Sequence, residues 1–475
     1  MTLLNWKHAT LFLLAALAVN ASAATNPQPN IVFILADDLG YGDLGCYGQT
    51  VIKTPNLDRM AAEGLRFTQH YAGSAVCAPS RCSLMTGLHS GHSQIRGNGP
   101  SALRPDPQDI TVATLLKRAG YQTAMIGKSS VAGQDDNPNL PNAKGFDHFF
   151  GYLHHTRAHD YFPTNLIRDG QTITYTNNHL DFGDTYSCDL FIRDALDWIT
   201  QHKSGPFFLF YSTTLPHPSL YAPEDWKAKY RGEFSDAPAA SYGNYRHENE
   251  PKTTYAAMVS RLDWEAGQIL AKLKELGIAT NTLVIFGSDN GAMNEGGHKR
   301  TDFNSSGSLR GGKRDLTEGG IRVPLIAQWP GKIEAGKSTT HVSAFWDFLP
   351  TACDLAQIKT PSGLDGISYL PTLLGKSNDQ KQHEFLYWEF YEQGGKRAAR
   401  LGQWKAIQLN LNNASPDPIQ LYDLEADPGE TNDIVEQHPD IVKRMRKIFE
   451  AEHTESASWS WSNSREKATG RKAKK

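Results

Sequence analysis

Short apolar runs alternate with longer segments of helical periodicity along most of this chain. Five runs have the length and composition of buried strands: residues 30–36, 121–126, 206–211, 282–287 and 320–328. The last run is the weakest, because Pro324 lacks a backbone donor and restricts a strand to a bulge or a sheet edge. Three intervening segments have helical periodicity: residues 109–119, 189–202 and 253–276. This alternation predicts an α/β fold.

The pattern changes near residue 375, where a polar stretch ends the alternation. Three short strand candidates and one helical segment follow: residues 385–391, 397–401, 404–409 and 440–452. Residues 465–475 are rich in basic side chains, which is typical of a flexible tail. The chain is therefore expected to divide into a main domain at residues 24–375, a C-terminal unit at residues 376–464 and the tail.

The first 23 residues have the pattern of a secretory signal peptide. Lys7 precedes an apolar run at residues 11–19, and Ala21-Ser22-Ala23 matches a cleavage site. A run of about nine residues is too short to cross a bilayer of about 30 Å. We therefore expect cleavage near Ala23, a periplasmic or secreted protein, and no transmembrane segment. A buried N-terminal helix is the alternative interpretation.

Composition narrows the class of protein. The chain has 475 residues, with 48 Lys and Arg against 51 Asp and Glu, for a formal net charge of -3. Because nucleic-acid-binding domains are usually strongly basic, this balance argues against a nucleic acid as partner. The five cysteines are too few for a disulfide scaffold, and their odd number leaves at least one thiol unpaired.

Polar side chains follow four of the predicted strands. Asp37 and Asp38 follow the first strand, Lys128 the second, His217 the third, and Asp289 with Asn290 the fourth. Since ligands bind beyond the carboxyl ends of strands in open parallel sheets, we expect these side chains to meet in one place. A single acidic pair would more often be a turn or a helix cap. Carboxylate and amide oxygens together favour a hard cation, Ca²⁺ or else Mg²⁺.

Cys77 lies at the start of a predicted helix. Pro79 and the run that ends at Gly87 place this cysteine at or just before a helix N-terminus. Free backbone N–H groups and the helix dipole favour an anion there, and Arg81 adds a positive charge one turn later. A buried, inert cysteine in a capped helix is the alternative.

The segment from Cys77 to Gly87 (CAPSRCSLMTG) resembles the signature of the formylglycine-dependent sulfatases. Other segments match motifs of that family in the same order: 34–43 (ILADDLGYGD), 54–58 (TPNLD), 127–128 (GK), 216–217 (PH), 287–291 (GSDNG), 309–313 (LRGGK), 318–324 (EGGIRVP) and 421–432 (LYDLEADPGETN). The resemblance covers residues from about 30 to 435. It is greatest to bacterial members akin to arylsulfatase A and the N-acetylgalactosamine sulfatases.

This resemblance implies an alkaline-phosphatase-like fold, with a large mixed sheet between helices and a smaller C-terminal antiparallel sheet with a helix. It implies that a maturation enzyme oxidises Cys77 to formylglycine, which then serves as the nucleophile on sulfur. The implied metal ligands are Asp37, Asp38, Cys77, Asp289 and Asn290. Arg81 would orient the formylglycine, while Lys128, His217 and Lys313 would hold the sulfate and the leaving group. The implied activity is hydrolysis of sulfate esters.

The substrate is expected to be a sulfated oligosaccharide. Residues 151–163 bring His155, Arg157 and His159 close to aromatic residues, and His298 follows the second acidic motif. Such loops suit a sugar ring, although a solvated surface loop would have the same composition. Residues 91–98 (GHSQIRGN) resemble a segment of sulfatases that act on galactose or N-acetylgalactosamine sulfates. We therefore expect exo-action on a sulfated galacto-configured sugar of a galactan or glycosaminoglycan.

One departure from the family keeps two other functions open. The family commonly continues the Gly-Lys motif with Trp and then His or Gly, whereas Ser129 and Ser130 follow Lys128 here. A phosphate or phosphonate ester hydrolase of the same superfamily is the nearest alternative. A catalytically silent carbohydrate-binding protein on a sulfatase scaffold is the alternative of another class.

Overall fold

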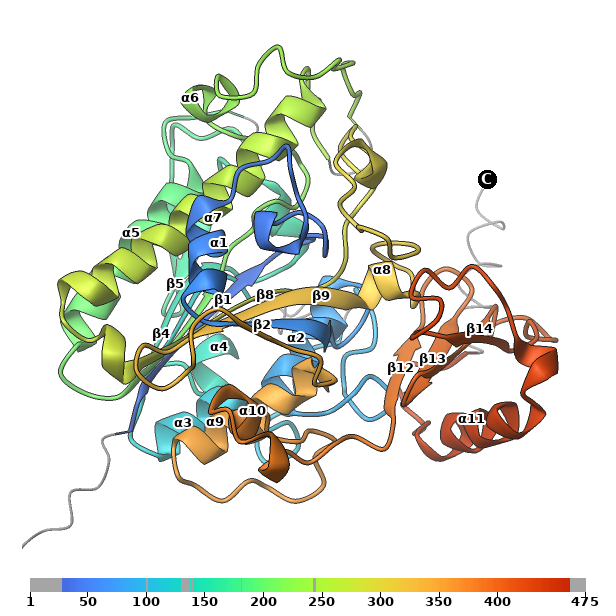
Figure 1. Cartoon of the computed structure of the whole chain (residues 1–475). Coiled ribbons are helices and arrows are strands. Elements are labelled where there is room, and N and C mark those ends of the chain that lie inside the picture. Colours follow the sequence, from blue (N-terminus) through green and yellow to red (C-terminus); the bar gives the residue numbers. More distant parts are fainter. Residues whose placement is uncertain are drawn as a thin grey trace, which may run out of the picture.

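The computed structural model describes residues 28–99, 101–129, 137, 140–180, 182–241 and 245–461. The expected signal peptide with its cleavage site, and the basic tail, lie outside the described residues. The described residues form a large mixed sheet between two layers of helices, with a smaller sheet at one end (Figure 1). No described helix has both the length and the apolar character needed to cross a membrane.

Ten strands form the main path of the large sheet. In spatial order they are β10 (Lys337–Thr339), β2 (Leu65–Tyr71), β9 (Arg322–Gln328), β8 (Thr282–Ser288), β1 (Asn30–Ala36), β7 (Phe207–Ser212), β3 (Gln122–Lys128), β4 (His148–Tyr152), β5 (Asn165–Arg168) and β6 (Gln171–Thr174). The short strand β11 (Ser343–Ala344) also pairs with β2. The strands from β8 to β4 are mutually parallel, and β9 is antiparallel to both of its neighbours.

The sheet contains all five strands expected in the main domain, with ends displaced by one or two residues. The start of β9 is displaced by two residues because residues 318–321 form a helical turn, α8 (Glu318–Ile321). β9 is an internal strand, so Pro324 does not mark an edge. It lies instead opposite a register shift between Phe67 and His70 of β2. Such a bulge interrupts the backbone hydrogen bonds, so the missing N–H of a proline is tolerated there.

Helices cover both faces of the large sheet (Figure 1). One face carries α1 (Pro55–Ala62), α5 (Ser187–His202) and α7 (Pro251–Glu275), and the other carries α2 (Cys77–Thr86), α3 (Val112–Arg118) and α9 (Phe348–Leu355). The remaining helical turns are short: α4 (Leu140–Ala143), α6 (Glu224–Lys227), α10 (Leu370–Leu373), η1 (Gly45–Tyr47), η2 (Thr156–His159), η3 (Ala279–Asn281), η4 (Arg300–Asp302), η5 (Phe345–Asp347), η6 (Ser377–Asp379) and η7 (Val435–Gln437). β1 shows why two layers form, because Val32 and Ile34 pack into one core and Ile31 and Phe33 into the other.

The smaller sheet contains four antiparallel strands, β12 (Leu386–Phe390), β13 (Lys396–Leu401), β14 (Trp404–Leu409) and β15 (Gln420–Asp423). One face packs toward the main domain through Trp388 and Trp346, and the other packs on α11 (Pro439–Ala451) through Met445 and Phe449. The sequence predicted three of these strands and the helix. It missed β15, which is only four residues long.

All five cysteines lie in the described part of the chain, and none pairs with another. Cys82, Cys188 and Cys353 are buried in the hydrophobic cores, and Cys46 is half-buried. The fold therefore depends on packing and polar contacts for its stability.

A buried ion triplet connects the smaller sheet to the main domain. The Nζ atom of Lys405 on β14 lies 2.8 Å from Glu318 Oε1 and 3.0 Å from Glu430 Oε1, and all three side chains are inaccessible to solvent. Because removing one member leaves buried charges unpaired, Lys405→Met is expected to lower the free energy of unfolding by about 3–5 kcal/mol. Urea unfolding measures this, with the exposed Lys443→Met as the control. An unchanged midpoint for Lys405→Met would show that the triplet contributes nothing.

His148 on β4 makes the stability depend on pH. Its ring nitrogens lie 2.9 Å from Asp169 Oδ2 and 2.7 Å from Asp194 Oδ2. Burial lowers the pKa of His148, but these two hydrogen bonds outweigh burial and raise the pKa to about 9. Since the folded pKa exceeds the unfolded value of about 6.5, the stabilisation is complete below pH 6.5 and is lost as the pH rises toward 9.

The expected loss between pH 6 and pH 9 is on the order of 1–2 kcal/mol after solvent screening. Urea midpoints at the two pH values measure it. His148→Gln should remove this part of the pH dependence, whereas the exposed His247→Gln should not. Equal pH dependence in His148→Gln and the wild type would refute the assignment.

Candidate active site

The carboxyl ends of β1 and β8 hold adjacent acidic pairs. Asp37 and Asp38 follow β1, Asp289 and Asn290 follow β8, and all four are fully buried. The two strands are parallel neighbours, and Asp289 N donates to the carbonyl of Ala36 at 3.1 Å. Asp38 N in turn donates to Asp289 Oδ1 at 3.0 Å. The parallel pairing therefore brings together the side chains that the sequence predicted to meet.

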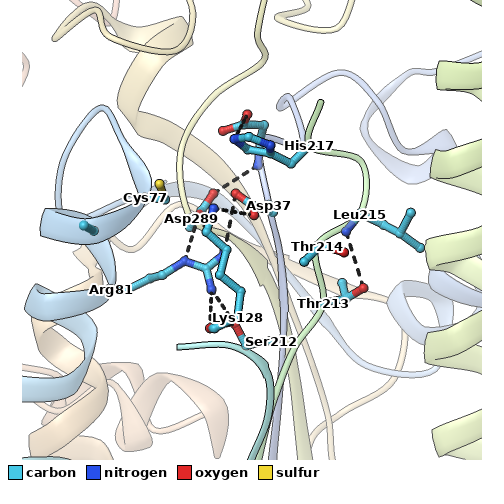
Figure 2. A network of polar contacts seen from close by, with 12 residues as sticks. Asp37, Cys77, Arg81, Lys128, Ser212, Thr213, Thr214, Leu215, His217 and Asp289 are labelled. Carbon is cyan, nitrogen blue, oxygen red and sulfur yellow. Dashed lines mark hydrogen bonds and ion pairs between the residues drawn. The ribbon is translucent and has the colours of Figure 1, made fainter. Parts of the chain in front are cut away.

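α2 brings Cys77 and Arg81 to the same place. The helix begins at Cys77, as predicted, and all of its residues are buried. Arg81 donates from Nε to Asp289 Oδ2 at 2.9 Å and from NH1 to the carbonyl of Lys128 at 3.0 Å. Figure 2 shows its guanidinium group between Asp289 and the end of β3. Burial raises the pKa of the Cys77 thiol, so this cysteine is not an activated thiolate.

Two lysines and a histidine complete the cluster. Lys128 Nζ donates to Asp37 Oδ2 and Lys313 Nζ donates to Asp38 Oδ2, each at 2.6 Å. Lys313 Nζ also lies 3.2 Å from His217 Nε2. His217 Nδ1 donates to the carbonyl of Pro218, so Nε2 has its lone pair directed at Lys313. Burial and Lys313 together hold the pKa of His217 well below its usual value, which leaves the imidazole neutral.

The negative charges of the buried carboxylates and the positive charges of the neighbouring Lys and Arg side chains offset one another. Burial, together with Asp37, raises the pKa of Asp289 to about 7. Burial acts in the same direction on Asp38, but the ammonium group of Lys313 holds the pKa of that carboxyl below its usual range. The site thus places fixed positive charge beside closely packed carboxylates, which is an arrangement that can bind a metal ion and an anion together.

The donor set fits a hard divalent cation. Asp37 Oδ1 and Asn290 Oδ1 are buried and accept no hydrogen bond from the described residues. Asn290 Nδ2 donates to Asp38 Oδ1 at 2.8 Å, which leaves its oxygen as the free ligand atom. Ligand atoms of Asp37, Cys77 and Asp289 lie within 4.8 Å of one another. Buried oxygens without a hydrogen bond in a carboxylate cluster are what Ca²⁺ or Mg²⁺ would satisfy.

The residues expected to bind the sugar lie in different surroundings. His159 stacks on His217 with ring centroids 4.7 Å apart, and His155 is half-buried, with its pKa lowered to about 4 by burial and Lys128. Arg157 is exposed on η2 between them. His298 is apart from these three, because its buried ring stacks on Tyr255 at 4.0 Å. A contact of His298 with the substrate stays a prediction.

Several site residues escaped the sequence analysis. Ser212, the last residue of β7, accepts a hydrogen bond from Arg81 NH1, and nothing in its local sequence signals this contact. Asn98 Oδ1 lies 3.5 Å from Cys77 Sγ, although its segment was noted only for sugar recognition. Glu295 contacts Arg314 and accepts a hydrogen bond from Tyr245 at 2.9 Å, beside Lys313. These pairs join segments that are distant in sequence.

Comparison with known families agrees with this geometry. The sulfatase family model matches residues 29–358, and the model of the N-sulphoglucosamine sulphohydrolase C-terminal region matches residues 311–455. N-acetylgalactosamine-6-O-sulfatase of Bacteroides thetaiotaomicron is 30% identical, and the match covers 90% of this chain and 93% of that protein. Human arylsulfatase A is 32% identical, with 91% and 89% covered.

A solved structure gives the same result for the fold. The crystal structure of Ps i-CgsB in complex with k-i-k-neocarrahexaose superposes with a TM-score of 0.75 at 29% sequence identity, and covers 90% of this chain and 93% of that chain. The expected architecture, a large mixed sheet between helices with a smaller antiparallel sheet, is therefore confirmed. The chain belongs to the sulfatase family and is a sulfuric ester hydrolase.

Proposed function

We propose that this enzyme hydrolyses a sulfate ester of a sugar, with Cys77 as formylglycine and a divalent metal ion, Ca²⁺ or else Mg²⁺. The observation that carries the proposal is the buried convergence of Cys77, the acidic pairs and three cationic side chains at the ends of parallel strands. The proposed metal ligands are Asp37, Asp38, Cys77, Asp289 and Asn290. The proposed domain limits are residues 24–375 and 376–464, with cleavage of a signal peptide near Ala23 before secretion.

The metal and the hydrated aldehyde supply charge neutralisation and the nucleophilic hydroxyl, respectively. The other side chains hold the sulfate group and orient the residues around it. Arg81 holds Asp289 and the backbone of Lys128 in place and carries a positive charge next to residue 77. Lys128 and Lys313 provide ammonium groups for the sulfate oxygens, where negative charge accumulates as the ester bond breaks.

His217 is the proposed proton donor to the leaving oxygen. Because Nδ1 is fixed by the Pro218 carbonyl, Nε2 is the atom that can carry the transferred proton. Lys313 Nζ lies 3.2 Å from this atom and keeps the imidazole neutral, so Nε2 takes up its proton from water once the charge of the bound sulfate offsets that of the lysine. His159 stacks on a face of the imidazole ring and restricts its rotation.

The proposed substrate is a galacto-configured sugar sulfate at the end of a galactan or glycosaminoglycan fragment. The comparisons support this class, since the Bacteroides relative is named N-acetylgalactosamine-6-O-sulfatase and the Ps i-CgsB structure is a complex with k-i-k-neocarrahexaose. His155, Arg157 and His159 are the proposed sugar contacts, because they flank the cationic cluster on one loop. A formylglycine-generating enzyme is the required partner for maturation.

Initial rates on a panel of substrates test the proposal. Enzyme matured with the formylglycine-generating enzyme is assayed with 4-nitrophenyl sulfate, 4-nitrophenyl phosphate, 4- and 6-sulfated galactose and N-acetylgalactosamine, and the corresponding sulfates of glucose and N-acetylglucosamine. We expect sulfate esters to be preferred and a galacto-sugar to exceed its gluco-epimer. Preference for phosphate would indicate the phosphohydrolase, and binding of sulfated sugars without any turnover would indicate the silent carbohydrate-binding protein.

A further inference from the structure

Asn98 lies against the residue that carries the proposed nucleophile. Its Oδ1 atom accepts a hydrogen bond from Ala78 N at 3.2 Å and lies 3.5 Å from Cys77 Sγ, with the thiol as donor. The carboxamide oxygen is therefore directed at the first turn of α2 and at the side chain of residue 77. In the mature protein, the contacting sulfur stands in for an oxygen of the formylglycine group.

The smaller sheet fixes the position of Asn98. The backbone N–H of Asn98 donates to Glu392 Oε1 at 2.7 Å, and Glu392 lies in the turn after β12. Gly97 and Gly99 flank Asn98 and pack against the indole ring of Trp459. A Cβ atom at these positions would come within 2.8 Å and 2.6 Å of the ring, so only glycine allows this approach. Trp459 is itself held by a 3.0 Å hydrogen bond from Nε1 to the carbonyl of Gln94.

Arg96, which precedes Gly97, also contacts the C-terminal part of the chain. Arg96 is almost fully buried and donates to the Thr454 carbonyl at 2.8 Å and to Glu389 Oε2 at 3.2 Å. Residues 96–99 are thus bound on both sides to the C-terminal part of the chain. These contacts fix the backbone that carries Asn98, and the hydrogen bond from Ala78 N fixes the direction of its carboxamide oxygen, which is what selective stabilisation of one chemical form requires.

We propose that Asn98 stabilises the hydrated form of the formylglycine at position 77, and that Glu392 is its positioning residue. This inference rests on the proposed function. On hydration, water adds across the aldehyde C=O bond: its oxygen bonds to the carbon and one proton moves to the former carbonyl oxygen. The resulting geminal diol has two O–H donors, whereas the aldehyde has none. An acceptor at this place therefore favours the diol and leaves the aldehyde unaffected.

Oxime formation with an aminooxy probe tests the inference, because the probe reacts with the free aldehyde only. Asn98→Leu removes the acceptor and keeps the bulk of the side chain, so the access of the probe is not widened. We expect labelling to be on the order of 2–10-fold faster than in the wild type and kcat to fall by a similar factor with little change in KM. Asn98→Asp keeps an acceptor and should label at the wild-type rate.

Labelling rates are normalised to the aldehyde content of the Cys77 peptide, measured by mass spectrometry. Glu392→Leu should change labelling in the same direction as Asn98→Leu, by a smaller factor, because it acts through the position of Asn98. Equal labelling of Asn98→Leu and the wild type would overturn the inference, as would fast labelling of Asn98→Asp. Absence of any aldehyde in active wild-type enzyme would instead refute the proposed function.

Discussion

Replacing Cys77 with alanine is expected to lower kcat for 4-nitrophenyl sulfate by about 10⁴-fold or more, because the proposed nucleophile is lost while the binding groups remain. The fold should survive, since within the described residues the sulfur makes one hydrogen bond, at 3.5 Å to Asn98, and it lies beside Asp37 and Asp289 in the site rather than in a hydrophobic core. Initial rates and urea unfolding together measure both effects.

Cys82→Ala is the matched control. Cys82 lies on the same helix, is also fully buried, and packs into the hydrophobic core between the sheet and α2. We expect this variant to lose stability, by about 1–2 kcal/mol for a small buried group, and to keep its turnover. Near-wild-type rates in Cys77→Ala would refute the assignment of the nucleophile.

Replacing Asp289 with asparagine is expected to weaken Ca²⁺ binding by about 10-fold or more, because a negatively charged ligand becomes neutral. The same change should lower kcat by about 10²-fold or more, with partial recovery in excess Ca²⁺. The amide keeps one oxygen for Arg81, which donates to Asp289 Oδ2 at 2.9 Å, but its NH2 group would face the N–H of Asp38, so we also expect a loss of stability that urea unfolding measures. Equilibrium dialysis gives the metal affinity, and initial rates across a Ca²⁺ series give the recovery.

Asp365→Asn is the control, because Asp365 belongs to another group of candidate ligands, with His89, His92 and Glu452. Hydrogen bonds already satisfy that group: Gly91 N donates to His89 Nδ1 at 3.2 Å, and His89 Nε2 therefore carries the proton that faces Glu452 at 3.1 Å. A metal at Nε2 would have to displace this proton. Loss of Ca²⁺ binding in Asp365→Asn but not in Asp289→Asn would contradict the proposed metal site.

The central strands could be predicted because a strand buried on both faces is a continuous run of apolar residues in the sequence. β1 and β8 are continuous apolar runs, and their residues are buried throughout. β6 (QTIT) is mostly exposed at the edge of the sheet, and its sequence contains no apolar run. The strand expected at residues 320–328 begins two residues later, because Gly320 and Ile321 belong to the helical turn α8, and so short a turn leaves no periodicity in the sequence.

The site residues that directly follow a strand could be predicted, because the pairing of the strands determines where these residues lie. Asp37 and Asp289 follow neighbouring parallel strands, so pairing alone brings them together. The contact of Asn98 with Cys77 depends instead on Glu392, which lies almost 300 residues further along the chain. Local periodicity contains no information about such contacts, because they form only when the smaller sheet packs on the main domain.

The mass of the Cys77 peptide from active enzyme tests the central claim most directly. The protein is produced together with the formylglycine-generating enzyme, purified by its activity on 4-nitrophenyl sulfate, and digested for mass spectrometry. We predict that residue 77 is formylglycine, in the aldehyde or hydrated form, in the fraction that turns over substrate. An unmodified thiol at residue 77 throughout a fully active preparation would contradict the account.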